Sequence, residues 1–352
     1  MLKVEIRDDV AVFDELATWW NAQPGPQESV FLRSEWFRTL APTVVGPAES
    51  LQVFVIRDGE DPVAALPMYR SGRKLRSLTE LSTETFDLIH QGDPRPIERL
   101  VSELNRHTMV RLEAVPDSSP LAVTANRNRR WHIDNRTDLA TIDLEPGLDS
   151  LLANLGRNMR SNLSRGRRAL EEMGQVVMEA HPTADRVDGV LSEGLALESA
   201  GWKGRSDHSI MSSKMRLSFF TELAAMAQAN DWLRLGALYV DGHMVAFQYD
   251  LEYAGRQVLL LTCYDESLSR ASPGNVLLWK TLEAGVERGV RTYELGSIGG
   301  RKAWKLRWTS ATSPRVYIAA FGSNPPGRIA NVAWLERSRL RELRSRRVPA
   351  VA

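Results

Sequence analysis

Hydrophobic and polar residues follow two periods along this chain, one typical of strands and one typical of helices. Three strand-like runs succeed one another in the second half, at residues 232–240, 244–253 and 257–264. The pairs Asp241-Gly242 and Ala254-Gly255 separate these runs, and both pairs suit tight hairpin turns. The pattern therefore predicts three consecutive antiparallel strands.

Helical spacing surrounds the three strands. A basic helix is predicted over residues 148–173, closed by Gly174, and further helices over residues 185–199 and 215–230. A fourth helix starts at Ser272-Pro273-Gly274 and ends near Gly289, because proline is favoured at the first helical position. Short strands are predicted at residues 175–180, 292–295 and 316–321.

The first half mixes the two patterns. Residues 13–21 and 34–41 have helical spacing, with Ser34 as a candidate N-cap, and residues 51–57 and 62–69 form a predicted hairpin. The remaining predicted elements are strands near residues 75–82, 109–115, 131–135 and 140–144, and a helix at 96–106. Glu145-Pro146-Gly147 marks a boundary. We therefore expect domains at residues 1–145 and 146–322, followed by a basic C-terminal helix within 323–352.

That C-terminal helix covers residues 328–347 and carries an apolar stripe made of Trp334, Leu335, Leu340 and Leu343. We expect the stripe to dock on the protein and the arginines to face water. The total length of 352 residues agrees with two domains. The formal net charge of +1 gives no global reason to expect nucleic acid or an anionic membrane as partner.

Several classes of chemistry are excluded by what the sequence lacks. The single cysteine, Cys263, lies in an apolar run and cannot form an internal disulfide. The six histidines are scattered, so we predict no metal site. Phosphate-loop, dinucleotide-binding, zinc-protease and serine-hydrolase motifs are all missing. The N-terminus lacks an apolar stretch, so we expect a cytoplasmic protein without membrane insertion. Direct transfer between two positioned substrates remains.

The best positive feature is the predicted strand–loop–helix segment at residues 258–279. Gly274 permits close approach of a ligand, and the free amides of the first helical turn can bind phosphate. An ordinary capped helix is the alternative. The residues we assign to donor binding here are Arg270, Ser272, Pro273, Gly274 and Asn275, with Tyr264 as a substrate contact.

Two further segments carry candidate chemistry. A glycine-rich turn after residues 291–296 leads to Trp304 and Lys305, and we select Lys305 as a cation for a reacting carbonyl or a phosphate; a solvated surface lysine is the alternative. Glu198 ends a predicted helix and precedes Trp202 and Lys203, a candidate substrate wall; helix-end capping is the alternative for Glu198.

The basic helix is the fourth feature. Its arginines include Arg157 and Arg160, which lie near one face with Arg168 and could hold a polyphosphate or RNA. A solvated basic face is the alternative.

In this order, the segments resemble the FemAB-related, BioF2-like branch of the GNAT acetyltransferases, which includes the CelD-type proteins of cellulose clusters. The resemblance rests on residues 157–163, 198–203, 264–265, 272–274 and 294–296, followed by Lys305. It implies an α/β (α+β) fold with two GNAT-like domains in tandem. Each domain would be a mixed, mostly antiparallel sheet flanked by helices, and the active site would lie in the second.

The resemblance also implies roles. Residues 272–275 would face the phosphates of the donor, and Lys305 would stabilise the carbonyl or bind phosphate. Glu198 or Asp250 would accept the proton of the amine. The usual GNAT phosphate loop is replaced here by residues 270–275. Three functions stay open: an acyl-CoA-dependent N-acyltransferase, an aminoacyl-tRNA-dependent transferase acting on a small molecule or peptide amine, and a non-catalytic binding protein.

Overall fold

A computed structural model describes residues 2–180, 182–201, 204 and 209–345, apart from the side chains of 300–303 and 341–345. Two compact units make up the structure. Unit 1 comprises Met1–Gln27, Phe31–Arg136 and Arg315–Ala352, and unit 2 comprises Glu28–Val30 and Thr137–Pro314. The chain crosses between them inside strands β7 (Trp131–Asp143) and β13 (Thr312–Phe321), rather than in the loops where we expected boundaries.

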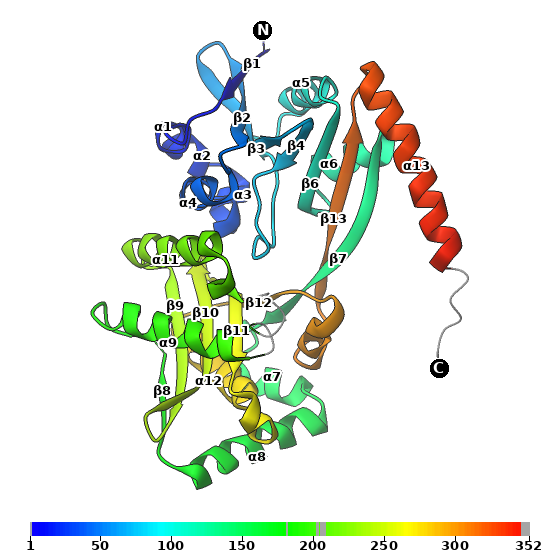
Figure 1. Cartoon of the computed structure of the whole chain (residues 1–352). Helices are drawn as coiled ribbons and strands as arrows, with labels where there is room; N and C mark the ends of the chain where they lie inside the picture. Colours follow the sequence, from blue (N-terminus) through cyan, green and yellow to red (C-terminus); the bar gives the residue numbers. More distant parts are fainter. Residues whose placement is uncertain (1, 181, 202–203, 205–208, 346–352) are drawn as a thin grey trace. The chain divides into compact units, whose positions relative to one another are not determined.

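Unit 1 contains an antiparallel meander that continues into a parallel pair (Figure 1). Its strands are β1 (Leu2–Arg7), β2 (Glu49–Asp58), β3 (Asp61–Ser71), β4 (Lys74–Ser77), β5 (Ile89–His90) and β6 (Met109–Pro116). Its helices are α1 (Val12–Glu15), α2 (Ala17–Asn21), α3 (Pro24–Glu28), α4 (Ser34–Val44), α5 (Pro94–Leu104), α6 (Pro120–Arg127) and α13 (Pro325–Ser345), with the 3-10 turn η1 (Val30–Leu32).

Several local predictions for unit 1 need correction. The predicted helix at 13–21 is two short helices, and the N-cap of α4 is Arg33 rather than Ser34. Strand β4 ends at Ser77, so residues 78–88 form a loop instead of extending the strand. Strand β1 and helix α6 were not predicted. The sequence pattern fails here because the elements are short and tertiary contacts decide them.

Helix α13 docks through only part of its predicted stripe. The indole of Trp334 stacks on His132 at 4.4 Å between ring centroids and packs against Phe321. Leu335 and Leu340 of the same stripe are exposed. The expectation of a continuous docked stripe is therefore wrong. Trp334 holds this part of the helix together with Ala330, which packs in the same cluster, and Asn331, whose Oδ1 is 2.7 Å from His132 Nε2.

Unit 2 has the predicted element order. The order across its sheet is the C-terminal part of β7, then β12 (Thr292–Ser297), β11 (Arg256–Tyr264), β10 (His243–Tyr253), β9 (Leu233–Val240) and β8 (Val176–Glu179). Neighbouring strands are antiparallel except for β11 and β12, which are parallel. The helical elements are α7 (Leu148–Asn154), α8 (Arg157–Met173), α9 (Val187–Ala200), α11 (Lys214–Ala229) and α12 (Pro273–Glu287), with η2 (Ile210–Ser212), η3 (Glu266–Ala271) and η4 (Gly300–Arg307).

Helices cover both faces of this sheet (Figure 1). Phe247 and Tyr249 of β10 contact α9 and α11, respectively. Gln248 lies between them in sequence and therefore points to the opposite face, where Thr281 of α12 donates a hydrogen bond to it at 2.7 Å.

Two predicted turns are confirmed, and one predicted helix is broken. The hairpin turns contain Asp241-Gly242 and Ala254-Gly255, all four with positive φ as tight hairpins require. The predicted helix at 148–173 is interrupted at residues 155–156, where α7 ends and α8 begins. The Arg160 guanidinium donates to the carbonyls of Leu152, Ala153 and Leu155 at this break, which satisfies the end of α7.

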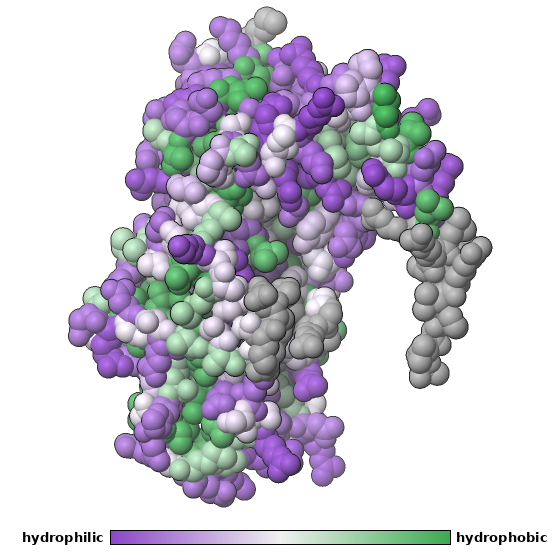
Figure 2. All heavy atoms as spheres, viewed as in Figure 1, coloured by the Kyte–Doolittle hydropathy of each residue, from purple (hydrophilic) through white to green (hydrophobic). Residues whose placement is uncertain are grey.

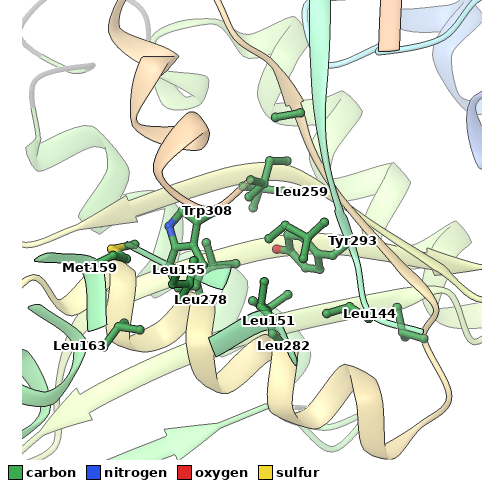
Figure 3. Packing of buried hydrophobic residues seen from close by; sticks show 14 residues of the cluster. Leu144, Leu151, Leu155, Met159, Leu163, Leu259, Leu278, Leu282, Tyr293 and Trp308 are labelled. Carbon is green, nitrogen blue, oxygen red and sulfur yellow. The ribbon is translucent and has the colours of Figure 1, made fainter. Parts of the chain in front are cut away.

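The main hydrophobic cluster of unit 2 lies where α7, α8 and α12 meet the sheet (Figure 3). Figure 3 shows Trp308, which follows η4, beside Leu155 and Leu278. The cluster therefore anchors the segment after β12 to the helices. On the face that Figure 2 shows, hydrophilic side chains are spread over both units. Within the described ranges, no helix is long and apolar enough to cross a membrane.

Candidate active site

The parallel strands β11 and β12 pair over a short stretch only. Their register joins Arg256–Val258 to Thr292–Glu294. Both strands then continue, β11 to Tyr264 and β12 to Ser297, each paired with its other neighbour. Over these described residues no further pairing joins the two strands. The pairing of β11 with β12 therefore ends at Val258 and Glu294.

Helix α12 begins just beyond the carboxyl end of β11. Ser272 has φ 50° and ψ 50°, a left-handed conformation that costs a residue with a side chain about 1–3 kcal/mol. Pro273 is the first helical residue and has no amide hydrogen. The amides of Asn275 and Val276 donate to the Ser272 carbonyl at 3.0 and 3.2 Å, which leaves the Gly274 amide of this turn for an incoming anion. A Cβ on Gly274 would meet the ring of Tyr264 at 3.3 Å, so the helix start packs closely against the strand end. An anion can approach this turn without hindrance from its own side chains.

Helix α8 holds the start of α12 in place. The Asn162 amide nitrogen donates to Ser272 Oγ at 3.1 Å, and Asn275 Nδ2 donates to Asn162 Oδ1 at 3.2 Å. A Cβ on Gly166 would lie 2.5 Å from the carbonyl oxygen of Ala271, so α8 requires glycine there. Asn162 and Gly166 were missed by sequence reasoning. Their spacing of four residues on the basic helix was the available signal, since it places both on one face.

Lys305 is buried, with 6% of its surface exposed, in η4 directly after β12. Its neighbours in the same turn, Trp304 and Trp308, pack against the main cluster. A solvated surface lysine is therefore excluded as the explanation for this residue. A buried ammonium group is costly unless it meets polar or negative partners, which makes its position specific.

Glu198 organises the loop that follows α9. Its side chain is buried, and its Oε2 accepts hydrogen bonds from Ser209 Oγ at 2.6 Å and from the Ile210 amide at 3.1 Å. The carboxylate therefore caps the start of η2. The predicted wall residues Trp202 and Lys203 lie outside the described residues.

Asp250 is buried on the α12 face of the sheet. Its Oδ2 accepts hydrogen bonds from Gln257 Nε2 at 2.7 Å and from the Tyr293 hydroxyl at 2.8 Å. Its Oδ1 has no hydrogen-bond partner among the described residues. Burial raises the pKa of this carboxyl to about 7, although both hydrogen bonds favour the charged form. Gln257 and Tyr293 were also missed from sequence.

Residues 157–306 match the family model described as "Acetyltransferase (GNAT) domain". This part of the chain belongs to the GNAT acetyltransferases. No curated protein matches the chain. The matched GNAT domain contains β11, the start of α12, β12 and Lys305, which are the elements described above.

Solved structures show the same fold over most of the chain. A structure of FemX aligns with TM-score 0.59 at 9% identity, covering 91% of this chain and 98% of that one. The C-terminal domain of a putative lysylphosphatidylglycerol synthetase from Agrobacterium fabrum aligns with TM-score 0.54 at 14% identity, covering 94% and 96%. A tandem GNAT protein from the clavulanic acid biosynthesis pathway aligns with TM-score 0.53 at 15% identity, covering 92% and 99%. The predicted GNAT fold is confirmed, and the chain carries an acyltransferase domain.

The GNAT domain brings some of the predicted residues together. Tyr264 and Gly274 are in close contact, and the donor-binding candidates Ser272 and Asn275 share Asn162 as a partner. Arg270 is exposed in η3, two residues before Ser272.

The two arginines of α8 that we predicted as substrate contacts differ in their exposure and hydrogen bonding. Arg157 is exposed at the first position of the helix, whereas Arg160 is engaged with the end of α7. Arg160 therefore has a structural role that the sequence pattern did not indicate. Among the residues described, no group of histidine, cysteine and carboxylate side chains is suited to a metal ion.

Proposed function

We propose that the GNAT domain moves an acyl group from an acyl-CoA thioester to an amine by direct attack. The observation that carries this proposal is the end of pairing between β11 and β12 beside the first turn of α12. An extended arm with amide groups can pair with a strand through main-chain hydrogen bonds. The phosphates of the same donor would then reach the helix start.

The reaction needs no covalent enzyme intermediate. The amine nitrogen forms a bond to the thioester carbonyl carbon, and the carbon–sulfur bond breaks. The sulfur leaves as the CoA thiolate, which becomes the thiol by taking up a proton equivalent to the one that the amine loses. We assign Lys305 to the negative charge that develops on the carbonyl oxygen, because preorganised cations at such a position are effective in a buried site. Trp304 and Tyr264 would line the path of the acceptor and the donor.

The proton of the amine requires an acceptor, and two carboxyl groups are candidates. Asp250 has a pKa of about 7, which suits a base at neutral pH, but it is buried behind Tyr293 and Gln257. A proton would reach it through the Tyr293 hydroxyl. Glu198 is the second candidate, with its Oε2 held by Ser209 and Ile210.

An aminoacyl-tRNA donor is the second candidate function. It is favoured by exposed arginines on α8, among them Arg157 and Arg168. Phosphate contacts by such residues would make binding fall steeply with salt concentration. Acyl-CoA would show a weaker dependence, because it carries far fewer phosphates than a tRNA.

Two substitutions test the role of Lys305. Lys305→Met removes the charge at similar side-chain length, and Lys280→Met does the same at a partly exposed lysine of α12 whose ammonium binds Glu283. With acetyl-CoA, longer acyl-CoAs and bulk aminoacyl-tRNA as donors, we expect Lys305→Met to lower kcat/KM by about 10²-fold. Lys280→Met should stay near wild type. Equal activity of both variants and wild type would contradict the assignment of Lys305.

The same assays identify the donor. Saturable binding of a CoA thioester, with transfer to an amine, would support the leading proposal. Binding of charged tRNA alone, lost between low and moderate salt, would replace it with aminoacyl transfer.

A further inference from the structure

A second recess lies at the opposite end of the GNAT-domain sheet. Leu233 at the start of β9 pairs with Leu251 at the end of β10, and Leu251 pairs with Val258 near the start of β11. A cavity of about 340 Å³ opens beside Leu233. It is therefore at the amino ends of β11 and β12, whereas the proposed donor site is at their carboxyl ends. Its volume falls within the range of small-molecule sites, about 300–1,000 Å³.

Two arginines line this cavity and share one carboxylate. Arg234 Nε and Arg288 Nε both donate to Glu252 Oε2, at 3.0 and 2.9 Å. The exposed fractions of the three side chains are 12%, 25% and 15%. Two cations and one anion leave this largely buried group with one net positive charge. Arg234 also contacts Asp231, but that side chain is 93% exposed and water screens its charge.

Each arginine has donors left over. The hydrogen bonds of Arg234 use its Nε and Nη1, and those of Arg288 use its Nε and Nη2. Arg234 Nη2 and Arg288 Nη1 make no hydrogen bond to any described residue. A guanidinium carries five N–H groups, so these nitrogens can donate to an oxyanion in the cavity.

The rest of the lining is mainly apolar. Pro182, Val187, Leu233 and Leu235 contribute to it, so a ligand with a hydrocarbon body would bury that body here. One net positive charge is matched by a monoanion.

We propose that this cavity is a binding site for a small organic monocarboxylate. Its carboxylate would accept hydrogen bonds from Arg234 and Arg288, and its hydrocarbon chain would pack on Val187, Leu233 and Leu235. The site is separate from the proposed donor site and does not depend on which donor the GNAT domain uses.

Binding of defined probes to the full-length chain tests this site. Straight-chain carboxylates of increasing length, the primary alcohols of matching length and inorganic phosphate would be titrated by calorimetry. We expect one saturable carboxylate site per chain, with affinity that first rises with chain length and then falls when the chain outgrows the cavity. The alcohols should bind at least tenfold more weakly, because they lack the charge.

Two variants locate the binding. Gln228→Trp places a bulky ring at an exposed lining residue of α11, and Arg288→Lys keeps the charge but loses the forked donors. Each should weaken carboxylate binding by tenfold or more. Arg256→Lys, at an arginine of β11 that pairs with Glu294 outside the cavity, is the matched control and should bind normally.

Three results would overturn the proposal. The first is the absence of saturable carboxylate binding to the wild-type chain. The second is unchanged binding in both Gln228→Trp and Arg288→Lys. The third is tighter binding of inorganic phosphate than of every carboxylate, which would assign the arginines to a dianion instead.

Discussion

Asp250 shows how the fold changes the chemistry of a single residue. In the sequence it is an ordinary aspartate in a strand-like run, and nothing there reports the Tyr293 hydroxyl or the Gln257 amide that bind it. Its burial, which depends on α12 covering the sheet, raises its pKa to about 7. Packing around Asp250 therefore decides whether its carboxyl can act as a base, and the sequence alone does not show that packing.

The raised pKa predicts a pH dependence of stability. The unfolded aspartate has a pKa of about 3.9, so the folded state holds this proton more tightly. The contribution of Asp250 to the free energy of unfolding should fall as pH rises from about 4 to about 7, and then level off.

Asp250→Asn cannot titrate and removes that contribution. The difference in unfolding free energy between wild type and Asp250→Asn should change by on the order of 4 kcal/mol across this window. Urea denaturation at a series of pH values measures it. A difference that is constant from pH 4 to pH 8 would show that the carboxyl titrates normally.

At the scale of elements, the contact between α8 and the start of α12 is the feature that shapes the site. Gly166 lets α8 approach the backbone of Ala271, and Asn162 connects to Ser272 and Asn275. The left-handed residue Ser272 is thus held by side-chain hydrogen bonds from a helix more than a hundred residues earlier in the chain. The position of the phosphate-ready turn depends on this packing.

Two glycine substitutions separate packing from helix propensity. Gly166→Ala forces a Cβ to 2.5 Å from a backbone oxygen, so we expect a loss of about 1–3 kcal/mol in stability. Gly189→Ala, in α9 with open space around it, should instead stabilise by up to about 1 kcal/mol. Thermal or urea unfolding measures both. Similar effects of the two substitutions would argue against the close approach of α8.

Asn162→Ala tests the hydrogen-bonded connection itself. Each lost hydrogen bond is worth about 1 kcal/mol, so donor affinity should fall by up to about tenfold if α12 loses its position. Asn158→Ala, at an exposed residue of the same helix, is the control. Calorimetric titration with the donor measures both variants. Equal donor affinity in Asn162→Ala and wild type would mean that the turn holds its position without Asn162.

The sequence pattern predicted elements where local signals were strong. Strands β9, β10 and β11 and their turns were predicted because Asp241-Gly242 and Ala254-Gly255 are explicit turn signals between periodic runs. The break between α7 and α8 was missed, because the helical spacing of apolar residues continues across Leu155 and Gly156. In the structure α7 ends at Asn154, and the guanidinium of Arg160 donates a hydrogen bond to the carbonyl of Leu155. The burial of Lys305 was not predictable, since it depends on the docking of η4.

At the scale of the whole molecule, each unit contains one short parallel strand pair, β4 with β6 in unit 1 and β11 with β12 in unit 2. In unit 1, β4 and β6 pair over Lys74–Arg76 and Met109–Arg111 only. Beyond that point, the Glu113 amide of β6 donates a hydrogen bond to Ser77 Oγ at 3.1 Å, and the Ala114 carbonyl of β6 accepts one from the Phe86 amide at 3.0 Å. Phe86 thus pairs with the backbone of β6 beyond the parallel stretch, whereas we propose that in unit 2 the donor takes the corresponding place beside β11.

This difference predicts one donor site per chain. Titration of the full-length protein with its CoA thioester should give a stoichiometry near one, with no weaker second site of the same kind. The Phe86 ring is fully buried in unit 1, so the segment that carries it is part of the packed structure. Two equivalent sites per chain would contradict the assignment of donor binding to unit 2 alone.

Amide hydrogen exchange with and without acyl-CoA tests the central claim most directly, because it reports on the backbone of both units in one experiment. We predict added protection in the carboxyl half of β11, at residues 259–264, and in the first turn of α12, at residues 274–276, with none in β4 or β6. Protection confined to unit 1, or the same exchange with and without acyl-CoA at saturating concentration, would contradict donor binding between β11 and β12.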